Sequence, residues 1–270
     1  MIVVQLSDLH LRPRGLPAYR VAETNMLAAR AVEAVRALNP APDVVVITGD
    51  LSDNGLAEEY AELAPLLDRL PCPALCLLGN HDRRDTFRAA FPDRAGPGPF
   101  VDFVTDLGPL RLIGLDTVVP GASHGALCAA RLDALDAALA ARPEAPTLIF
   151  LHHPPFDCGI AHMDRIALVE GRERLGAIVA AHRQVERVCC GHHHRPIQTR
   201  FAATLAQVAP SVAHQVALSL EPDHEGALVL EPGAFLIHAL VDGAVVTHQA
   251  LVERFPGPFP FTLDPEYPGL

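Results

Sequence analysis

Short runs of aliphatic residues alternate with longer Ala- and Leu-rich stretches through the first two thirds of the chain. A short, continuous apolar run is typical of a strand buried on both faces. Such runs predict strands at residues 2–6, 44–48, 74–78, 111–115, 147–151 and 185–190. Apolar residues at helical spacing predict helices at 19–38, 56–70, 130–141 and 171–182. This alternation indicates an α/β architecture.

The pattern changes after His194, where short runs follow one another with few helices between them. They predict strands at residues 205–208, 212–219, 234–240 and 244–252. Asp242-Gly243 is a strong hairpin signal, so we expect a second, more antiparallel sheet to close the fold. The last residues hold many prolines, which exclude regular helix or central strand. We expect a core at residues 1–200, further strands and a hairpin of the same domain at 201–254, and a tail at 255–270 that is a solvated end or an oligomer arm.

Composition narrows the classes of function. All 21 Lys+Arg residues are Arg, which excludes Schiff-base lysine chemistry and a P-loop lysine. The formal net charge of -11 argues against a nucleic-acid polymer as partner. No apolar run approaches the ~20 residues of a membrane helix, so we expect no membrane partner. The six Cys form no CxxC pair and predict buried thiols, and we place the protein in the cytoplasm.

Polar side chains of one chemical kind follow five of the predicted strands. In an open α/β sheet, ligands bind beyond the carboxyl ends of the strands, so we expect these side chains to meet at one edge. The segments are Asp8-Leu9-His10, Gly49-Asp50, Gly79-Asn80-His81-Asp82, His152-His153-Pro154 and Gly191-His192-His193-His194.

Imidazoles, carboxylates and an amide oxygen suit Zn, Fe or Mn. One residue separates Asp8 from His10, and His192 from His194, so in extended backbone each pair points to one face and His193 points away. The donors suffice for two metals that share one carboxylate. Two cations ~3.5–4 Å apart would neutralise phosphate oxygens and turn a bridging water into an in-line nucleophile.

Together these five motifs, in this order, resemble the calcineurin-like metallophosphoesterase superfamily. The match runs from Asp8 to His194 and is similar to the class III bacterial branch of glycerophosphodiesterases and cyclic-nucleotide phosphodiesterases. The resemblance implies a four-layer αββα sandwich of two mixed sheets flanked by helices. It also implies two divalent ions per subunit, with Fe, Mn, Zn and Co all compatible.

The same resemblance assigns roles to residues, with Asp50 bridging the ions. His81 would lie over the phosphate and assist the leaving group, and Asp82 would orient the loop or His81 from behind. Asn80 and His214 would contact the substrate. The first ion would be held by Asp8, His10, Asp50 and His194, and the second by Asp50, Asn80, His152 and His192.

The expected activity is hydrolysis of small soluble phosphodiesters by a metal-bridging hydroxide. Glycerophosphodiesters and 3′,5′-cyclic nucleotides both remain open, and the stretches 162–164 and 212–216 favour the first. A protein phosphatase or other phosphomonoesterase is an alternative, but Asn54 and Asp82 stand where its motifs carry Arg and Glu. A nuclease conflicts with the acidic net charge, and a non-catalytic scaffold conflicts with the full donor set.

The Pro-rich tail and late hairpin resemble the dimerisation part of such enzymes and predict a homodimer or a larger homo-oligomer.

Four residues near the motifs have two interpretations each. His153 bonds to the backbone or joins the ligands. His193 faces solvent or packs behind them. His162 and Asp164 line the pocket or stabilise their loop.

Overall fold

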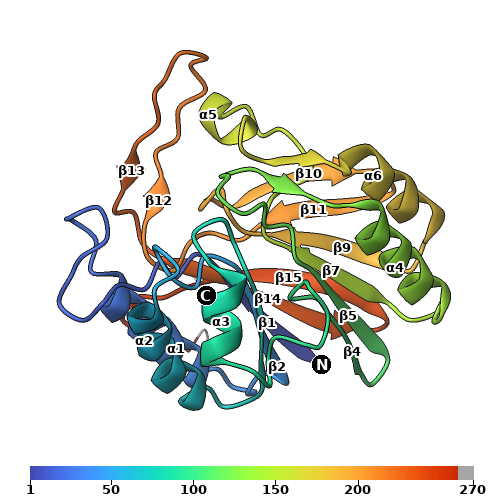
Figure 1. Cartoon of the computed structure of the whole chain (residues 1–270). Helices are drawn as coiled ribbons and strands as arrows, with labels where there is room; N and C mark the ends of the chain where they lie inside the picture. The colour runs from blue at the N-terminus through green and yellow to red at the C-terminus, as the bar shows by residue number, and fades with distance from the viewer. Residues whose placement is uncertain (261–270) are drawn as a thin grey trace.

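Two large sheets stacked face to face form the centre of the molecule (Figure 1). The structure, a computed structural model, describes residues 1–260. The first sheet has the strand order β15-β14-β1-β2-β3 and the second has the order β10-β11-β9-β7-β5-β4. In each sheet, parallel central strands are extended by antiparallel ones, so both sheets are mixed.

The first sheet is built from the N-terminal strands and the last hairpin. Its parallel part pairs Val3 with Val44 and Val45 with Ala74, while the hairpin adds to the other side of β1 through the Val3 and His238 pair. The turn of this hairpin is Asp242-Gly243, with φ of 49° and 84°, as its sequence predicts. The strands are β1 (Ile2–Leu6), β2 (Val44–Thr48), β3 (Ala74–Leu77), β14 (Ala234–Val241) and β15 (Ala244–Leu251).

The second sheet comes from the middle of the chain. Its strands β5, β7, β9 and β11 run parallel, and β4 and β10 add antiparallel edges. The strands are β4 (Phe103–Leu107), β5 (Leu110–Leu115), β7 (Thr147–Leu151), β9 (Val185–Cys190), β10 (Ile197–Phe201) and β11 (Thr204–Val208).

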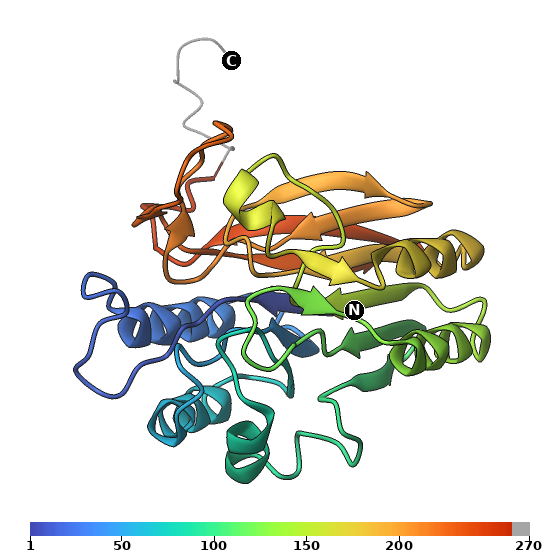
Figure 2. The same cartoon turned by 45° about the horizontal axis from the view of Figure 1, so that its top comes forward.

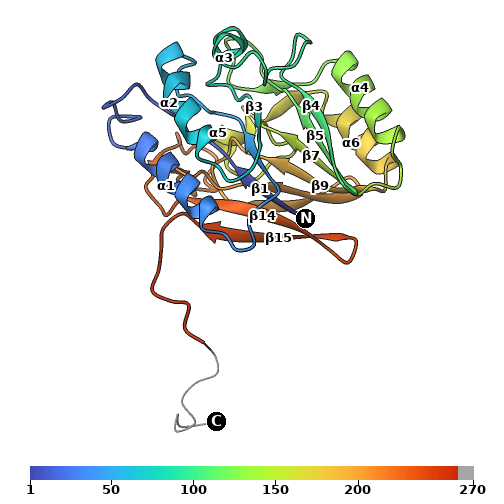
Figure 3. The same cartoon turned by 90° about the horizontal axis from the view of Figure 1, so that it is seen from below.

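Helices cover the outer face of each sheet. Figure 3 shows α1 and α2 at one side of the molecule and α4 and α6 at the other. The helices are α1 (Thr24–Arg36), α2 (Ala57–Asp68), α3 (Arg84–Ala90), α4 (Ala129–Ala140), α5 (Ala161–Asp164) and α6 (Arg172–Ala181).

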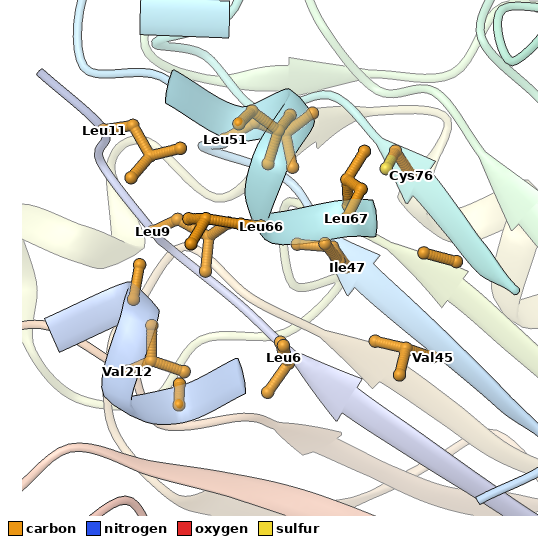
Figure 4. Close-up of a cluster of buried hydrophobic side chains, with 14 of the residues drawn as sticks. Leu6, Leu9, Leu11, Val45, Ile47, Leu51, Leu66, Leu67, Cys76 and Val212 are labelled. Atoms are coloured by element: carbon orange, nitrogen blue, oxygen red, sulfur yellow. The ribbon is translucent and has the colours of Figure 1, made fainter. Parts of the chain in front are cut away.

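Three hydrophobic layers hold the sandwich together. Leu6 and Ile47 pack with Leu67 of α2 in the outer layer of the first sheet (Figure 4). A second cluster joins α4 and α6 to the second sheet. The middle layer, with Val3 and Phe150, lies between the sheets. The expected four-layer αββα architecture is therefore confirmed, and burial of these apolar surfaces is its main stabilising contribution.

Smaller elements stand at the carboxyl ends of the central strands. A hairpin rises from the body beside α5 in Figures 1 and 2. It pairs only Gln215 with Val229 and Val216 with Leu228. The short strands are β6 (Gly125–Ala126), β8 (Leu168–Glu170), β12 (Gln215–Val216) and β13 (Leu228–Val229).

Several sequence predictions need correction. The predicted strand 212–219 is wrong, because only Gln215–Val216 pairs and the preceding residues form a buried loop. The helix predicted from residue 19 begins at Thr24. The strands after His194 do not gather in one sheet: β11 joins β9, whereas β14 and β15 join β1. Residues 261–270 of the predicted tail lie outside the described part of the chain. Among residues 1–260, no helix is both long and apolar enough to span a membrane.

Candidate metal centre

Five strands deliver polar side chains to one edge of the sandwich. From the first sheet, β1 leads to Asp8 and His10, β2 to Asp50, and β3 to Asn80 and His81. From the second sheet, β7 leads to His152 and β9 to the segment His192–His194. The site therefore straddles both sheets, and its geometry depends on how the sheets are held against each other.

The backbone at five of these positions is left-handed and not extended, which corrects the expected reason why Asp8 and His10, and His192 and His194, point the same way. Asp8, His10, Asp50, His192 and His194 all have positive φ, between 46° and 69°. Non-glycine residues adopt this left-handed region rarely and at a cost. The strands therefore turn sharply where they end, and each turn directs its side chain into the shared space.

Two glycines allow the strand ends to approach closely. A Cβ added at Gly79 would lie 2.2 Å from Asp50 Oδ1, and one at Gly191 would lie 2.1 Å from Ser7 Oγ. Neither position can carry a larger residue without displacing the side chains around Asp50 and Asp8. The glycines before these motifs are thus required by packing against the acids.

The first cluster contains Asp8, His10, Asp50 and His194, whose potential ligand atoms lie within 4.8 Å of one another. Nε2 of His10 is 3.2 Å from Nε2 of His194 and 3.5 Å from Asp50 Oδ2. Asp8 Oδ1 is 3.4 Å from His194 Nε2. All four residues are buried.

A second group lies on the other side of Asp50. The same oxygen, Asp50 Oδ2, is 3.4 Å from His152 Nε2, which is 3.2 Å from Asn80 Oδ1. His192 packs against His152 with ring centroids 4.9 Å apart, and its Nε2 donates to the Ile166 carbonyl, leaving Nδ1 free. One carboxylate oxygen therefore stands between two groups of donors.

Hydrogen bonds fix the imidazoles so that their lone pairs converge. Nδ1–H donates from His10 to Asp53 Oδ1 at 3.0 Å, from His152 to the Thr48 carbonyl at 2.8 Å, and from His194 to the His214 carbonyl at 2.9 Å. Each Nε2 then carries its lone pair inward, as metal-binding histidines do. This donor set fits divalent transition ions.

Charge in the site favours a bound cation. Burial raises the pKa of Asp8 to about 6. Burial alone would lower the pKa of His152, but the charge and hydrogen bond of Asp50, together with the charge of Asp8 and the Thr48 carbonyl, raise that pKa to about 9. Burial alone would raise the pKa of Asp50, but the charges of the surrounding histidines and a hydrogen bond from His152 together hold it well below its ordinary value. A field that attracts a proton this strongly also attracts metal ions.

Asp53 was missed by the sequence analysis. Besides accepting from His10, its carboxylate lies 3.2 Å from Arg12 Nη1, and its carbonyl oxygen accepts from His81 Nδ1–H at 2.8 Å. Asp53 therefore orients both histidines. The spacing Asp50-x-x-Asp53 was the sequence signal that could have identified Asp53, since it places a second acid three residues after the first in the same loop.

Asp82 lies behind the donors and ties two loops together. Its buried carboxylate accepts from the backbone N–H groups of Leu51, Ser52 and Gly79 at 2.9–3.0 Å, and from Tyr60 Oη–H at 3.0 Å. His81 itself donates its backbone N–H to Asp50 Oδ1 at 3.0 Å.

Two cavities meet at the donors. One, of about 460 Å³, is lined by the donors His10, His192 and His194 and by Tyr19, His162, His214 and the β12–β13 hairpin. The other, of about 640 Å³, is lined by Asp53, Arg83, Arg84 and the loop at Val118–Gly121. Asn80 and His81 line both. His214 is brought to the centre as well, with its ring 4.7 Å from that of His194.

The structure shows the contacts of the four residues that had two interpretations. His153 bonds within the protein, to Thr117 Oγ1 at 2.7 Å and to the Ser123 carbonyl at 3.2 Å. His193 is fully buried, so the solvent-facing interpretation is wrong. His162 lines the smaller cavity, whereas Asp164 stabilises its own loop by accepting from the N–H groups of Cys158 and Gly159.

Comparison with known proteins agrees with this geometry. Residues 1–196 match the model of the calcineurin-like phosphoesterase family. The chain is 36% identical over 264 residues to "Probable glycerophosphodiester phosphodiesterase GpdQ" of Arcobacter nitrofigilis, covering 97% of each chain. It is 29% identical to 3',5'-cyclic adenosine monophosphate phosphodiesterase CpdA of Pseudomonas aeruginosa, covering 80% and 78% of the two chains.

A solved dimetal phosphatase from Danio rerio shares the fold, with a TM-score of 0.72 at 16% identity, covering 94% of this chain and 96% of that one. The Arcobacter relative thus matches nearly the full chain, and the family model matches the part that carries all the strand-end motifs up to His194. From the sequence match and the clustered donors together, this chain belongs to the calcineurin-like phosphoesterase family.

Proposed function

We propose that this protein hydrolyses small phosphodiesters with the help of two divalent ions. The observation that carries the proposal is the position of Asp50 Oδ2, 3.5 Å from His10 Nε2 and 3.4 Å from His152 Nε2. One ion would be held by Asp8, His10, Asp50 and His194, and the other by Asp50, Asn80, His152 and His192. When bound, such a pair neutralises phosphate oxygens and lowers the pKa of a coordinated water.

His81 is the proposed proton donor to the leaving alcohol. Because its Nδ1–H is engaged by the Asp53 carbonyl, Nε2 is the atom that would hold and release a proton. Its side chain is 29% exposed, so it reaches the cavities that the donors line. Asp53 supports this role because it fixes the ring orientation.

The two cavities support a substrate with two separate arms. Since Asn80 and His81 border both, a phosphate bound beside them would have open space on two sides. A glycerophosphodiester joins two different alcohols through its phosphate and would use both spaces. In a 3′,5′-cyclic nucleotide both ester oxygens belong to one ribose, so one space would suffice. We therefore favour glycerophosphodiesters, in agreement with the name of the Arcobacter relative.

The test is a comparison of substrates under one set of metal conditions. We expect kcat/KM for glycerophosphoethanolamine to exceed that for cyclic AMP by at least about tenfold, which corresponds to about 1.4 kcal/mol of transition-state binding. The reverse order would favour the cyclic-nucleotide alternative. Absence of hydrolysis of both, and of bis(p-nitrophenyl) phosphate, by protein loaded with Mn, Zn, Co or Fe would refute the proposal.

Oligomer formation and location are further proposals. Leu218 and Leu220 of the hairpin, and Leu230 just after it, are more than half exposed, at 63%, 67% and 57%. Exposed leucines on a protruding segment favour contact with a second copy. Light scattering at micromolar concentration tests the assembly, and a monomeric mass would contradict it.

All six cysteines are free, which supports the cytoplasm as the location of the protein.

A further inference from the structure

A buried polar network crosses the otherwise apolar layer between the two sheets. Gln5, Thr48, Gln207 and His238 are fully buried there, in the layer that contains Val3. Burying amides and an imidazole is costly unless their hydrogen bonds are made. Such a network in the centre of a sandwich needs a reason that the apolar packing does not supply.

Gln5 connects three of the five strands that end at the metal centre. Its side-chain Nε2 donates to Thr48 Oγ1 at 3.0 Å and to the Cys190 carbonyl at 2.9 Å. Gln5 is on β1, Thr48 is the last residue of β2, and Cys190 is the last residue of β9. These strands lead directly to Asp8, Asp50 and His192. The amide therefore joins the two sheets just behind the candidate ligands.

The orientation of this amide is determined by chemistry. A carbonyl only accepts, so the NH2 group of Gln5 must face Cys190 and the Gln5 Oε1 must accept from elsewhere. That donor is His238 Nε2 at 3.2 Å. His238 is thus neutral, with its proton on Nε2 and its Nδ1 lone pair facing Thr247 Oγ1 at 3.0 Å and Gln207 Nε2 at 3.3 Å. Burial lowers the pKa of His238 to about 3, in agreement with a neutral ring.

The network continues from Gln5 to the ligands. Thr48 Oγ1 lies 2.8 Å from Ser7 Oγ, next to Asp8 in sequence. The carbonyl oxygen of Thr48 accepts from His152 Nδ1–H, so it orients a candidate ligand from the opposite sheet. On the Thr48 side, the network is therefore one residue away from Asp8 and one hydrogen bond away from His152.

We propose that Gln5, oriented by His238, is a positioning residue that sets the separation between the two halves of the metal centre. The inference rests on the proposed function, because it assumes that ions bind to donors from both sheets. The half on the first sheet contains Asp8 and Asp50, and the half on the second contains His152 and His192. A shift of one sheet against the other would change the distance that a shared carboxylate must bridge.

The experiment measures metal affinity, with Gln5→Leu compared to Val3→Ala. Val3 is on the same strand, two residues before Gln5, and lies in the same apolar layer between the sheets, so it controls for loss of packing. We expect Gln5→Leu to weaken Mn²⁺ binding, measured by calorimetry, by about tenfold or more. Tenfold is the lower end of the loss in metal affinity that follows mutation of residues supporting metal ligands. Val3→Ala should change the affinity for Mn²⁺ by less than about twofold, although its loss of thermal stability should equal or exceed that of Gln5→Leu.

A second pair of variants tests the direction of the hydrogen bonds. His238→Gln keeps an N–H donor for Gln5 Oε1 and should keep Mn²⁺ affinity near that of the natural protein. His238→Leu lacks the donor and should weaken affinity as Gln5→Leu does. In the unsubstituted protein, nitrogen NMR of the His238 ring should find the proton on Nε2. A proton on Nδ1 would overturn the assignment even if every variant failed to fold.

The outcomes separate this inference from the proposed function. Equal metal affinity in Gln5→Leu and Val3→Ala would overturn the positioning role and leave the proposed function standing. Fewer than two Mn²⁺ ions bound per subunit in the unsubstituted protein at saturation would remove the proposed function and this inference with it.

Discussion

The inner rim of the site and its outer wall are built in different ways. The rim consists of donors at strand ends, and its acids and histidines are buried, with the second ring nitrogen or carboxylate oxygen bonded to the protein. The outer wall consists of the loop around Tyr19, the short helix α5, and a hairpin with two paired residues in each strand. A two-stranded hairpin has little stability of its own. The chemistry is therefore fixed by the core of the fold, whereas the selection of substrate depends on weakly held elements.

The largest effect should follow from replacing the shared acid of the rim. Asp50→Ala removes a donor from both proposed ion sites, so the loss of kcat should exceed the ~10⁴-fold limit for a single proton-transfer residue. Elemental analysis of the variant after dialysis should find fewer than two ions per subunit. Full activity in this variant would show that the two donor groups do not act as one centre.

A smaller effect should follow from changing His81, which contacts the cavities without belonging to either proposed ligand set. His81→Ala should lower kcat by about 10²–10⁴-fold, because a proton donor is lost. The metal content should stay the same, which distinguishes this variant from Asp50→Ala. If the rate with bis(p-nitrophenyl) phosphate is unchanged, His81 has no part in proton transfer with that substrate.

The outer wall should affect binding rather than chemistry. Ala217 N and Ala227 O are 2.7 Å apart, so residues 218–226 can be replaced by Asn-Gly without breaking the hairpin. We expect KM for glycerophosphoethanolamine to rise by about tenfold, equivalent to about 1.4 kcal/mol of binding. The kcat for bis(p-nitrophenyl) phosphate should stay within about twofold. A fall of kcat to the level of His81→Ala would mean that rim and wall are not separable.

The smallest effect concerns the interior behind the rim. The pKa of His238 is about 3 in the folded protein, against an ordinary value of 6.5. The unfolded chain therefore binds a proton that the folded one does not, so stability falls as pH drops from about 6.5 toward 3. The slope is about 1.4 kcal/mol per pH unit for one group. Denaturant unfolding between pH 7 and 5 should give a shallower decline for His238→Gln than for the unsubstituted protein, and parallel curves would contradict this.

Much of the rim could be predicted from the sequence because its signals are local. The strands Thr147–Leu151 and Val185–Cys190 have the predicted bounds, since continuous apolar runs ended by polar residues leave few alternatives. The polar residues that follow these strands indicated a metal site, and their roles as individual ligands were implied by the family resemblance. Their roles stay predictions, although the structure brings all of the proposed donors into two adjoining groups.

Features that depend on distant partners could not be predicted in this way. The segment after Ser211 looks strand-like in sequence, but Val212 N–H donates to the Ser7 carbonyl and Ser211 Oγ–H donates to the Asp8 carbonyl. These bonds hold the segment in a loop against the end of β1. The edge strand Phe103–Leu107 has alternating exposure and gives a weaker signal. Gln5 looks like an ordinary polar residue in a strand, because its partner Cys190 is 185 positions away.

The left-handed turns at Asp8, His10, Asp50, His192 and His194 have a consequence for evolution and engineering. Each costs roughly 1 kcal/mol relative to relaxed backbone, so glycine at any of them would relieve the conformational cost. Such replacements would also remove the side chains on which turnover depends. Selection for heat resistance alone would therefore favour glycine at these five positions and produce inactive variants. A thermostable catalyst must be sought by substitutions elsewhere in the molecule.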